Sequence, residues 1–268
     1  MERSVRKSLL IATCFGLSFL GAPNAASAEV PVKMRMTYEV YFAGLHLFTS
    51  SAAYAVDKDT YRLDAVGQTE GIVTYLFDWK GRTLSTGELV DGLVVPKQHE
   101  SVGDINGERR SATLTYNSVG EITGFQVSPP PDADEVTDLP EDAEVGAIDP
   151  LSVLTELSRQ FENSGKCDGS YAVFDGRRRY DLTVSSEGER PLSQTGYGIF
   201  NGTAFTCRID FQMLGGERKE KSEIAQSARD QFVFVARPLP NLPAIPVGMR
   251  IDTDLGPIVA HLTDVSSE

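Results

Sequence analysis

Apolar and polar residues alternate along much of the chain, as expected for strands with one buried face. In residues 32–41, Met34, Met36, Tyr38 and Val40 alternate with polar residues. Further strands are predicted at 45–56, 61–68, 82–90, 93–102, 109–116 and 121–127, and then at 171–174, 177–184, 203–214, 231–236, 249–253 and 258–265. Many short strands at regular intervals predict a predominantly antiparallel β protein.

Hairpin turns are predicted where favourable dipeptides separate two strands. Asp91-Gly92, Asn106-Gly107 and Asp175-Gly176 are such dipeptides, because their residues tolerate the positive φ of a tight turn. Each predicts that the strands on its two sides are neighbours in the sheet.

An unusually apolar stretch lies between two predicted strands, at 72–79. Its apolar residues recur three and four positions apart, as on one face of a helix, and Gly71 and Gly81 bound it. The alternative is a strand, because Ile, Val, Tyr and Phe favour strands. We interpret the stretch as a short helix that packs inside the sheet. The residues expected to border an apolar cavity are Ile72, Val73, Leu76, Phe77 and Trp79; alternatively, they only fill the core.

A second helix is predicted to begin at Pro150. Asp149 is a suitable N-cap, and proline is favoured at the first helical position. Gly165 is a suitable residue to follow the helix. Its apolar stripe comprises Leu151, Leu154, Leu157 and Phe161.

The N-terminus has the three regions of a secretory signal peptide. Arg3, Arg6 and Lys7 precede an apolar run at 8–22, and Ala26-Ser27-Ala28 is a cleavage motif. We expect cleavage between Ala28 and Glu29 and a single β-rich domain at 29–268 in the periplasm, with no membrane span after processing. A retained anchor is the alternative. Lipidation at Cys14 is not expected, because the apolar run continues past it.

The charge of the chain excludes some partners. The formal net charge is −13, and loss of Glu2, Arg3, Arg6 and Lys7, one negative and three positive charges, brings it to −15. Such a surface repels nucleic acid, so we expect no nucleic-acid partner. Residues 129–148 are rich in proline and carboxylates and predict an exposed acidic loop. Their spacing does not match an EF-hand calcium loop.

Cys167 and Cys207 are the only cysteines after the predicted cleavage site. In an oxidising compartment they are expected to form a disulfide, with two buried thiols as the alternative. The three histidines, at 46, 99 and 261, lack the spacing of metal ligands. We therefore expect neither a metal nor a cofactor.

Few residues suggest binding or catalysis. Arg177 and Arg179 share a strand face and form a candidate site for an anion such as a lipid headgroup or carboxylate; the alternative is pairing with nearby acids. His46 is a candidate base or pH switch, or an ordinary sheet residue. There is no G-x-S-x-G motif, and scattered histidines do not define a triad, so we expect no enzyme.

Several segments resemble, in their order, the exported bacterial family known as domain of unknown function 3108. They are YEVYFAGLHL, YRLDAVGQTEGIVTYLFDWKG, DPLS, VFDGRRRYDL, the late Cys207 and P-x-G-x-R-I-x-T-D-L-G at 246–256. The resemblance implies a single curved antiparallel sheet, a half-barrel or β-spiral, wrapped around a short apolar helix, with a second helix. That architecture is similar to periplasmic lipoprotein carriers of the LolA/LolB type.

Three functions follow from these expectations. The first is a periplasmic protein that binds an apolar or lipid-like ligand in the concave sheet. The second is a structural or partner-binding protein of the cell envelope. The third is a hydrolase whose site has no recognisable motif. An apolar cavity would favour the first over the second.

Overall fold

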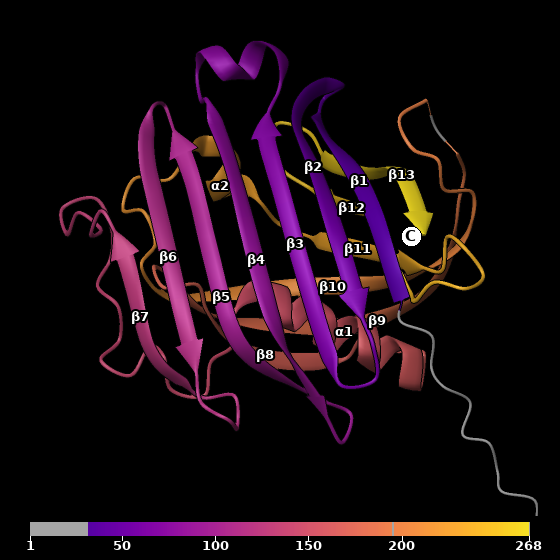
Figure 1. Cartoon of the computed structure of the whole chain (residues 1–268). Coiled ribbons are helices and arrows are strands. Elements are labelled where there is room, and N and C mark those ends of the chain that lie inside the picture. The colour runs from indigo at the N-terminus through magenta and orange to yellow at the C-terminus, as the bar shows by residue number, and fades with distance from the viewer. Residues whose placement is uncertain (1–31, 195, 268) are drawn as a thin grey trace, which may run out of the picture.

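The computed structural model describes residues 32–194 and 196–267. Thirteen strands in this part of the chain form one antiparallel sheet (Figure 1). The predicted fold class, mainly β with a single antiparallel sheet and helices, is confirmed. The predicted signal peptide lies outside the described residues.

The first seven strands form a meander that runs from the centre of the sheet to one edge. They are β1 (Val32–Phe42), β2 (Leu45–Val56), β3 (Thr60–Thr69), β4 (Trp79–Val90), β5 (Leu93–Ile105), β6 (Glu108–Tyr116) and β7 (Ile122–Ser128). The turns at Asp91-Gly92 and Asn106-Gly107 have positive φ at both residues, as the dipeptides predicted.

The chain then crosses to the opposite edge and returns to the centre. Helix α1 (Pro150–Ser164) makes the crossing, and the strands β8 to β13 lead back until β13 pairs with β1. The elements of this half are β8 (Gly169–Phe174), β9 (Arg179–Leu192), β10 (Gly202–Gly215), α2 (Glu223–Ser227), β11 (Gln231–Ala236), β12 (Ile245–Ile251) and β13 (Ile258–Ser267).

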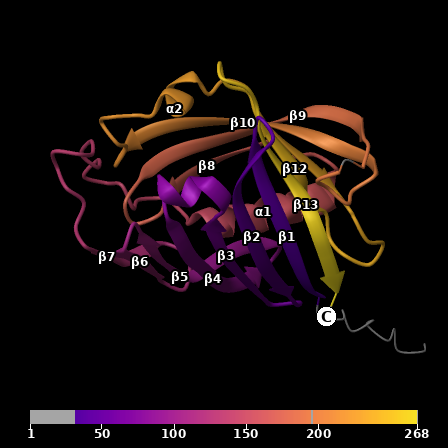
Figure 2. The same cartoon turned by 90° about the horizontal axis from the view of Figure 1, so that it is seen from above.

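Helix α1 lies between the two halves of the curved sheet (Figures 1 and 2). It begins and ends as predicted: Asp149 caps its N-terminus, and Gly165 follows it in the left-handed conformation at φ 67°. Leu151 and Val153 are buried, whereas Leu154 of the predicted stripe is 46% exposed. α1 is therefore the helix that occupies the concave side.

The expectation that the sheet wraps around 72–79 is wrong. Only Gly71–Tyr75 is helical, as the short 3-10 helix η1, and none of its residues is buried. Tyr75 and Leu76 are 88% and 86% exposed. The β3–β4 ladder ends at the pair Gln68 and Lys80, and residues 70–78 form a loop beyond the sheet (Figure 1).

Trp79, predicted to end the helix, belongs instead to a strand. It is the first residue of β4 and is half-buried. Its ring lies against the ring of Phe48, with 5.2 Å between the centroids, and covers Gly81. The stretch therefore divides into an exposed loop and the start of a strand.

The two edge strands, β7 and β8, share no ladder but are joined by other contacts, which we call the seam. The rings of Phe125 and Phe174 meet edge to face, with 5.0 Å between the centroids. Arg177 Nη2 lies 2.9–3.1 Å from the carbonyl oxygens of Ser111, Ser128 and Pro129. The open sheet is thus closed on itself by side chains.

The loop expected to be exposed at 129–148 is only partly exposed. Residues 131–135 are exposed, but Ala143 and Ala147 are buried against Leu114 and Phe174. Val136 and Arg218 form an isolated β-bridge. The second half of the loop therefore packs over the seam, because its alanines are small enough to enter the core there.

Candidate functional site

An apolar cavity of about 410 Å³ lies between α1 and the inner face of the sheet. Its volume falls in the lower part of the range of small-molecule pockets. Residues from β1, β2, β3, α1 and the β11–β13 region form its wall. They are Met34, Met36, Tyr38, Ser50, Ala52, Tyr54, Leu63, Ala65, Leu151, Leu154, Thr155, Ser158, Val233, Ala244, Ile245, Pro246, Gly248, Met249 and Ala260.

The cavity wall carries no charged residue, and four of its five hydroxyl groups, all but that of Tyr54, donate to backbone carbonyls within the protein. Tyr38 donates to the carbonyl of Pro246 at 2.9 Å, and Ser158 donates to that of Ala244 at 2.9 Å. Thr155 and Ser50 donate to backbone carbonyls at 3.2 Å. Apart from the Tyr54 hydroxyl, the wall therefore presents an apolar surface even where its residues are polar.

The five residues expected to border the cavity do not line it. None of the residues named above for 72–79 is part of its wall. On the strands, the wall is formed by residues at alternating positions, which include the small pair Ala52 and its cross-strand partner Ala65. Because Leu154 is half exposed, solvent reaches the wall at α1.

A buried polar network holds the N-terminus of α1 against the sheet. Ser85 on β4, His99 on β5 and Asp149 are at most 1% exposed. Ser85 Oγ donates to Asp149 Oδ1 at 2.5 Å, and His99 Nδ1 lies 2.8 Å from Ser85 Oγ and 3.1 Å from Asp149 Oδ1. Tyr116 and Ser152 donate to Asp149 Oδ2 at 3.1 and 2.5 Å.

The Asp149 carboxylate is stabilised in its charged form. Burial alone would raise its pKa, but the hydrogen bonds from His99, Ser152 and Ser85 outweigh burial and hold the pKa below its usual value. The backbone amides of Leu151 and Ser152 also donate to it, at 3.1 and 3.0 Å. Burial and the nearby Asp149 charge raise the pKa of Tyr116.

Ser85, His99 and Asp149 are of the three residue types that form a hydrolytic triad, but their hydrogen bonds are arranged differently. In a triad the serine hydroxyl donates to the histidine, which then removes its proton. A hydroxyl has one proton, and Ser85 gives it to Asp149, so His99 Nδ1 is the donor to both oxygens. With all three side chains buried, the network anchors a helix and offers no exposed nucleophile.

The candidate anion residues, Arg177 and Arg179, have partners within the protein. Arg177 makes the seam contacts described above. Arg179 Nη1 donates to Asp181 at 2.7 Å and to the carbonyl of Tyr180 at 2.7 Å. Burial, and then the nearby Arg110, lower the pKa of Arg177. The alternative of pairing with an acid therefore describes Arg179, while Arg177 bonds to backbone.

His46 and His261 belong to a cluster of rings. His46 stacks on Tyr41 with 5.0 Å between centroids, and its Nε2 lies 3.2 Å from Thr49 Oγ1. Tyr197 stacks on His261 at 6.0 Å. Burial lowers the pKa of His261. In the described part of the chain, no three His, Cys, Asp or Glu residues gather where they could hold a metal ion.

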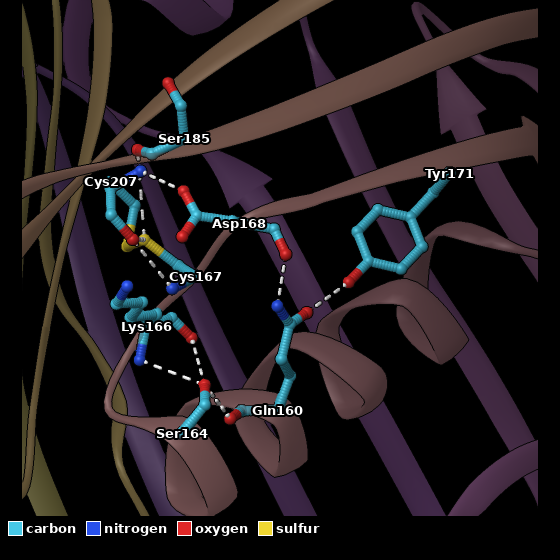
Figure 3. Close-up of a disulfide and its surroundings, with 9 residues drawn as sticks. Gln160, Ser164, Lys166, Cys167, Asp168, Tyr171, Ser185 and Cys207 are labelled. Atoms are coloured by element: carbon cyan, nitrogen blue, oxygen red, sulfur yellow. Dashed lines mark hydrogen bonds between the residues drawn. A yellow bond between two sulfur atoms is a disulfide. The ribbon is translucent and has the colours of Figure 1, made fainter.

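The predicted disulfide between Cys167 and Cys207 is present (Figure 3). It ties the segment after α1 to β10. Next to it, Gln160 of α1 donates to the carbonyl of Asp168 and accepts from Tyr171 of β8 at 2.8 Å. These contacts hold the C-terminal part of α1, as the Asp149 network holds its start.

No helix among the described residues is long and apolar enough to cross a membrane.

Comparisons with known proteins give a family and a fold neighbour. A family model described as "Protein of unknown function (DUF3108)" matches residues 37–263. Among curated proteins, none matches the sequence. The chain is similar to a beta-barrel-like protein of domain of unknown function DUF1849 from Brucella abortus. That crystal structure has a TM-score of 0.49 and 13% identity, covering 88% of this chain and 98% of the other.

Proposed function

The chain belongs to the DUF3108 family of unknown function, and we propose that it is an exported protein that binds an apolar, lipid-like ligand between α1 and the sheet. The observation that carries this proposal is the wall of the cavity, which is uncharged and whose hydroxyls, apart from that of Tyr54, are already bonded to backbone carbonyls. A fully polar ligand would lose its hydration there and find only the Tyr54 hydroxyl as a partner on the wall. An apolar ligand would gain about 25 cal/mol for each Å² removed from water.

The proposal places the protein outside the cytosol. The N-terminal regions that resemble a signal peptide support export, and a Cys167–Cys207 disulfide suits an oxidising compartment. N-terminal sequencing of the exported protein should find Glu29 first. An intact Met1 in the periplasmic fraction would contradict this part of the proposal.

The cavity offers a matched pair of variants. Ala52 lines the cavity, and Ala53, the next residue of β2, lies on the other face of the sheet. Ala52→Phe should fill the cavity and abolish binding of a neutral naphthylamine dye whose emission rises in apolar surroundings. Ala53→Phe should leave dye binding unchanged.

Displacement of the dye from the wild-type protein by a long-chain alcohol would identify the ligand as an apolar chain. Equal dye binding by the wild-type protein and Ala52→Phe would contradict the proposed site. Both variants are first compared with the wild type by circular dichroism, so that misfolding is recognised.

A partner-binding protein of the envelope is the second candidate, and one observation favours it. Ile72, Tyr75 and Leu76 are 63–88% exposed on one loop, and large apolar side chains gathered on a surface often mark an interaction site. If the protein is this second type, replacing Tyr75 and Leu76 with Ser should release a partner that is cross-linked to it in the periplasm. Dye binding in the cavity would not change.

A further inference from the structure

The uncharged cavity has one cationic neighbour on α1, Arg159. It follows Thr155 by four residues, and residues at this spacing are neighbours on a helix surface. Thr155 is part of the cavity wall and lies close to the hydroxyl of Tyr54, another wall residue. The charge of Arg159 acts on the Tyr54 hydroxyl. Arg159 therefore lies close to the wall residues Tyr54 and Thr155 without being part of the wall itself.

Arg159 lacks the acidic partner that a half-buried guanidinium usually has. Its Nε is buried without a hydrogen-bond partner, and its Nη2 reaches only the carbonyl of Gly92, at 3.4 Å. No carboxylate forms an ion pair with it in the described part of the chain. Buried polar groups of this kind are rare and call for a partner such as a ligand or water.

The acidic residues nearest to Arg159 along α1 have other partners. Glu156 accepts from the backbone amide of Val94 at 3.3 Å. Glu162 accepts from the amide of Ala244 at 2.5 Å and pairs with Arg237. Arg159 is thus an under-neutralised cation in a protein of net charge −13.

The Tyr54 hydroxyl, on the cavity wall, is a second donor close to Arg159. Burial, as the largest cause, raises the pKa of Tyr54 to about 12, so the hydroxyl keeps its proton at neutral pH. A guanidinium and a phenol together suit an oxyanion, because charge-assisted hydrogen bonds are stronger than neutral ones.

Resting on the proposed function, we infer that the ligand is an acyl chain with an anionic head group, a long-chain carboxylate, whose head lies at Arg159 and Tyr54 and whose chain fills the cavity. This arrangement matches each part of the ligand to its surroundings. The chain contacts the uncharged wall, and the carboxylate receives the unused Nε donor of Arg159. Leu154, half exposed, marks the place where the chain meets solvent.

The test compares three single-chain ligands of equal length: hexadecanoate, hexadecanol and hexadecyl phosphate. Binding is measured by displacement of the neutral dye at neutral pH. The wild-type protein should bind hexadecanoate at least about tenfold more tightly than hexadecanol. Arg159→Gln should remove this preference while the affinity for hexadecanol stays within about twofold.

Two further variants complete the test. Tyr54→Phe removes the second donor and should weaken hexadecanoate binding but not hexadecanol binding, which keeps the inference testable if Arg159→Gln does not fold. Arg62→Gln is the matched control, because Arg62 is an exposed arginine on β3 that pairs with Asp64. It should bind all three ligands as the wild type does.

The outcomes separate the inference from the proposed function. Equal binding of hexadecanoate and hexadecanol by the wild type, unchanged in Arg159→Gln, overturns the inference and leaves an apolar-ligand site. Tighter binding of hexadecyl phosphate than of hexadecanoate overturns the carboxylate and assigns the head group to phosphate. Failure of all three ligands to displace the dye overturns the inference, and failure of the dye itself to bind overturns the proposed function.

Discussion

Ser85 donates a 2.5 Å hydrogen bond to Asp149, the residue that caps α1, across a separation of 64 residues in the chain. Both side chains are fully buried. This bond joins the inner face of the sheet to the helix that forms one wall of the cavity. The position of α1, and with it the shape of the cavity, depends on that network.

Replacement of Asp149 by Ala should strongly destabilise the protein. Loss of an N-cap alone costs about 1 kcal/mol. Each hydroxyl left without its acceptor, the buried ones of Ser85 and Ser152 and the partly buried one of Tyr116, adds about 1–3 kcal/mol before any rearrangement. Urea denaturation should therefore show a loss on the order of 3 kcal/mol or more.

Ser222→Ala is the control for this change, because Ser222 caps the exposed helix α2 and belongs to no buried network. It should cost no more than about 1 kcal/mol. Similar losses in the two variants would mean that the network contributes nothing beyond capping.

Stability should fall in acid because of Asp149. Its pKa is lower in the folded protein than in the unfolded chain. Such a carboxylate stabilises the fold above its unfolded pKa, about 3.9, and this stabilisation is lost as the pH falls through the folded pKa. The advantage of the wild type over Asp149→Asn in urea denaturation should be constant from about pH 7 to about pH 5 and shrink below about pH 4. An advantage that grows in acid would contradict the assignment.

The seam should weaken when Arg177 is replaced by Ala. The change leaves carbonyl oxygens of Ser111, Ser128 and Pro129 without their donor, and hydrogen bonds to a charged group contribute about 1.5–3 kcal/mol. Hydrogen exchange should become faster in β7. Arg178→Ala is the control, because Arg178 is 61% exposed and lies 4.0 Å from Asp175, so it should cost less than about 0.5 kcal/mol. Equal exchange in β7 of both variants would show that Arg177 does not hold the seam.

Loss of the disulfide should lower stability. The bond closes a loop of 40 residues, for which the chain-entropy model gives roughly 4 kcal/mol as an upper figure. The double variant Cys167→Ser, Cys207→Ser should unfold at lower urea concentration than the oxidised wild type, and dithiothreitol should shift only the wild type. A wild-type curve unaffected by reduction would contradict a stabilising disulfide.

The sequence predicted local structure well where one residue decides the backbone. Asp91-Gly92 and Asn106-Gly107 predicted their hairpins, and Asp149 predicted the start of α1. The prediction for 72–79 is wrong because its apolar residues fit a helix whether or not the sheet extends far enough to cover it. The length of the β3–β4 ladder decides that question, and it ends at Gln68 and Lys80.

The buried network could not be read from the sequence, although two of its members lie on one predicted hairpin. A regular ladder from the turn at Asp91-Gly92 would oppose Ser85 with Gln98. A register shift between Thr86 and Gly87 moves the pairing by one residue, so Ser85 opposes His99 instead. Nothing in the alternation of apolar and polar residues in β4 or β5 indicates that shift. The cavity wall comes from both halves of the chain, so its prediction would require the registers of many strand pairs.

The central claim, that an apolar chain occupies the cavity between α1 and the sheet, is tested most directly by native mass spectrometry of protein purified from the periplasm. The account predicts one bound apolar molecule per chain in the wild type and in Ala53→Phe, and none in Ala52→Phe. Retention of the same molecule by Ala52→Phe, or a wild-type protein that carries no ligand and takes up none from added long-chain lipids, would contradict it.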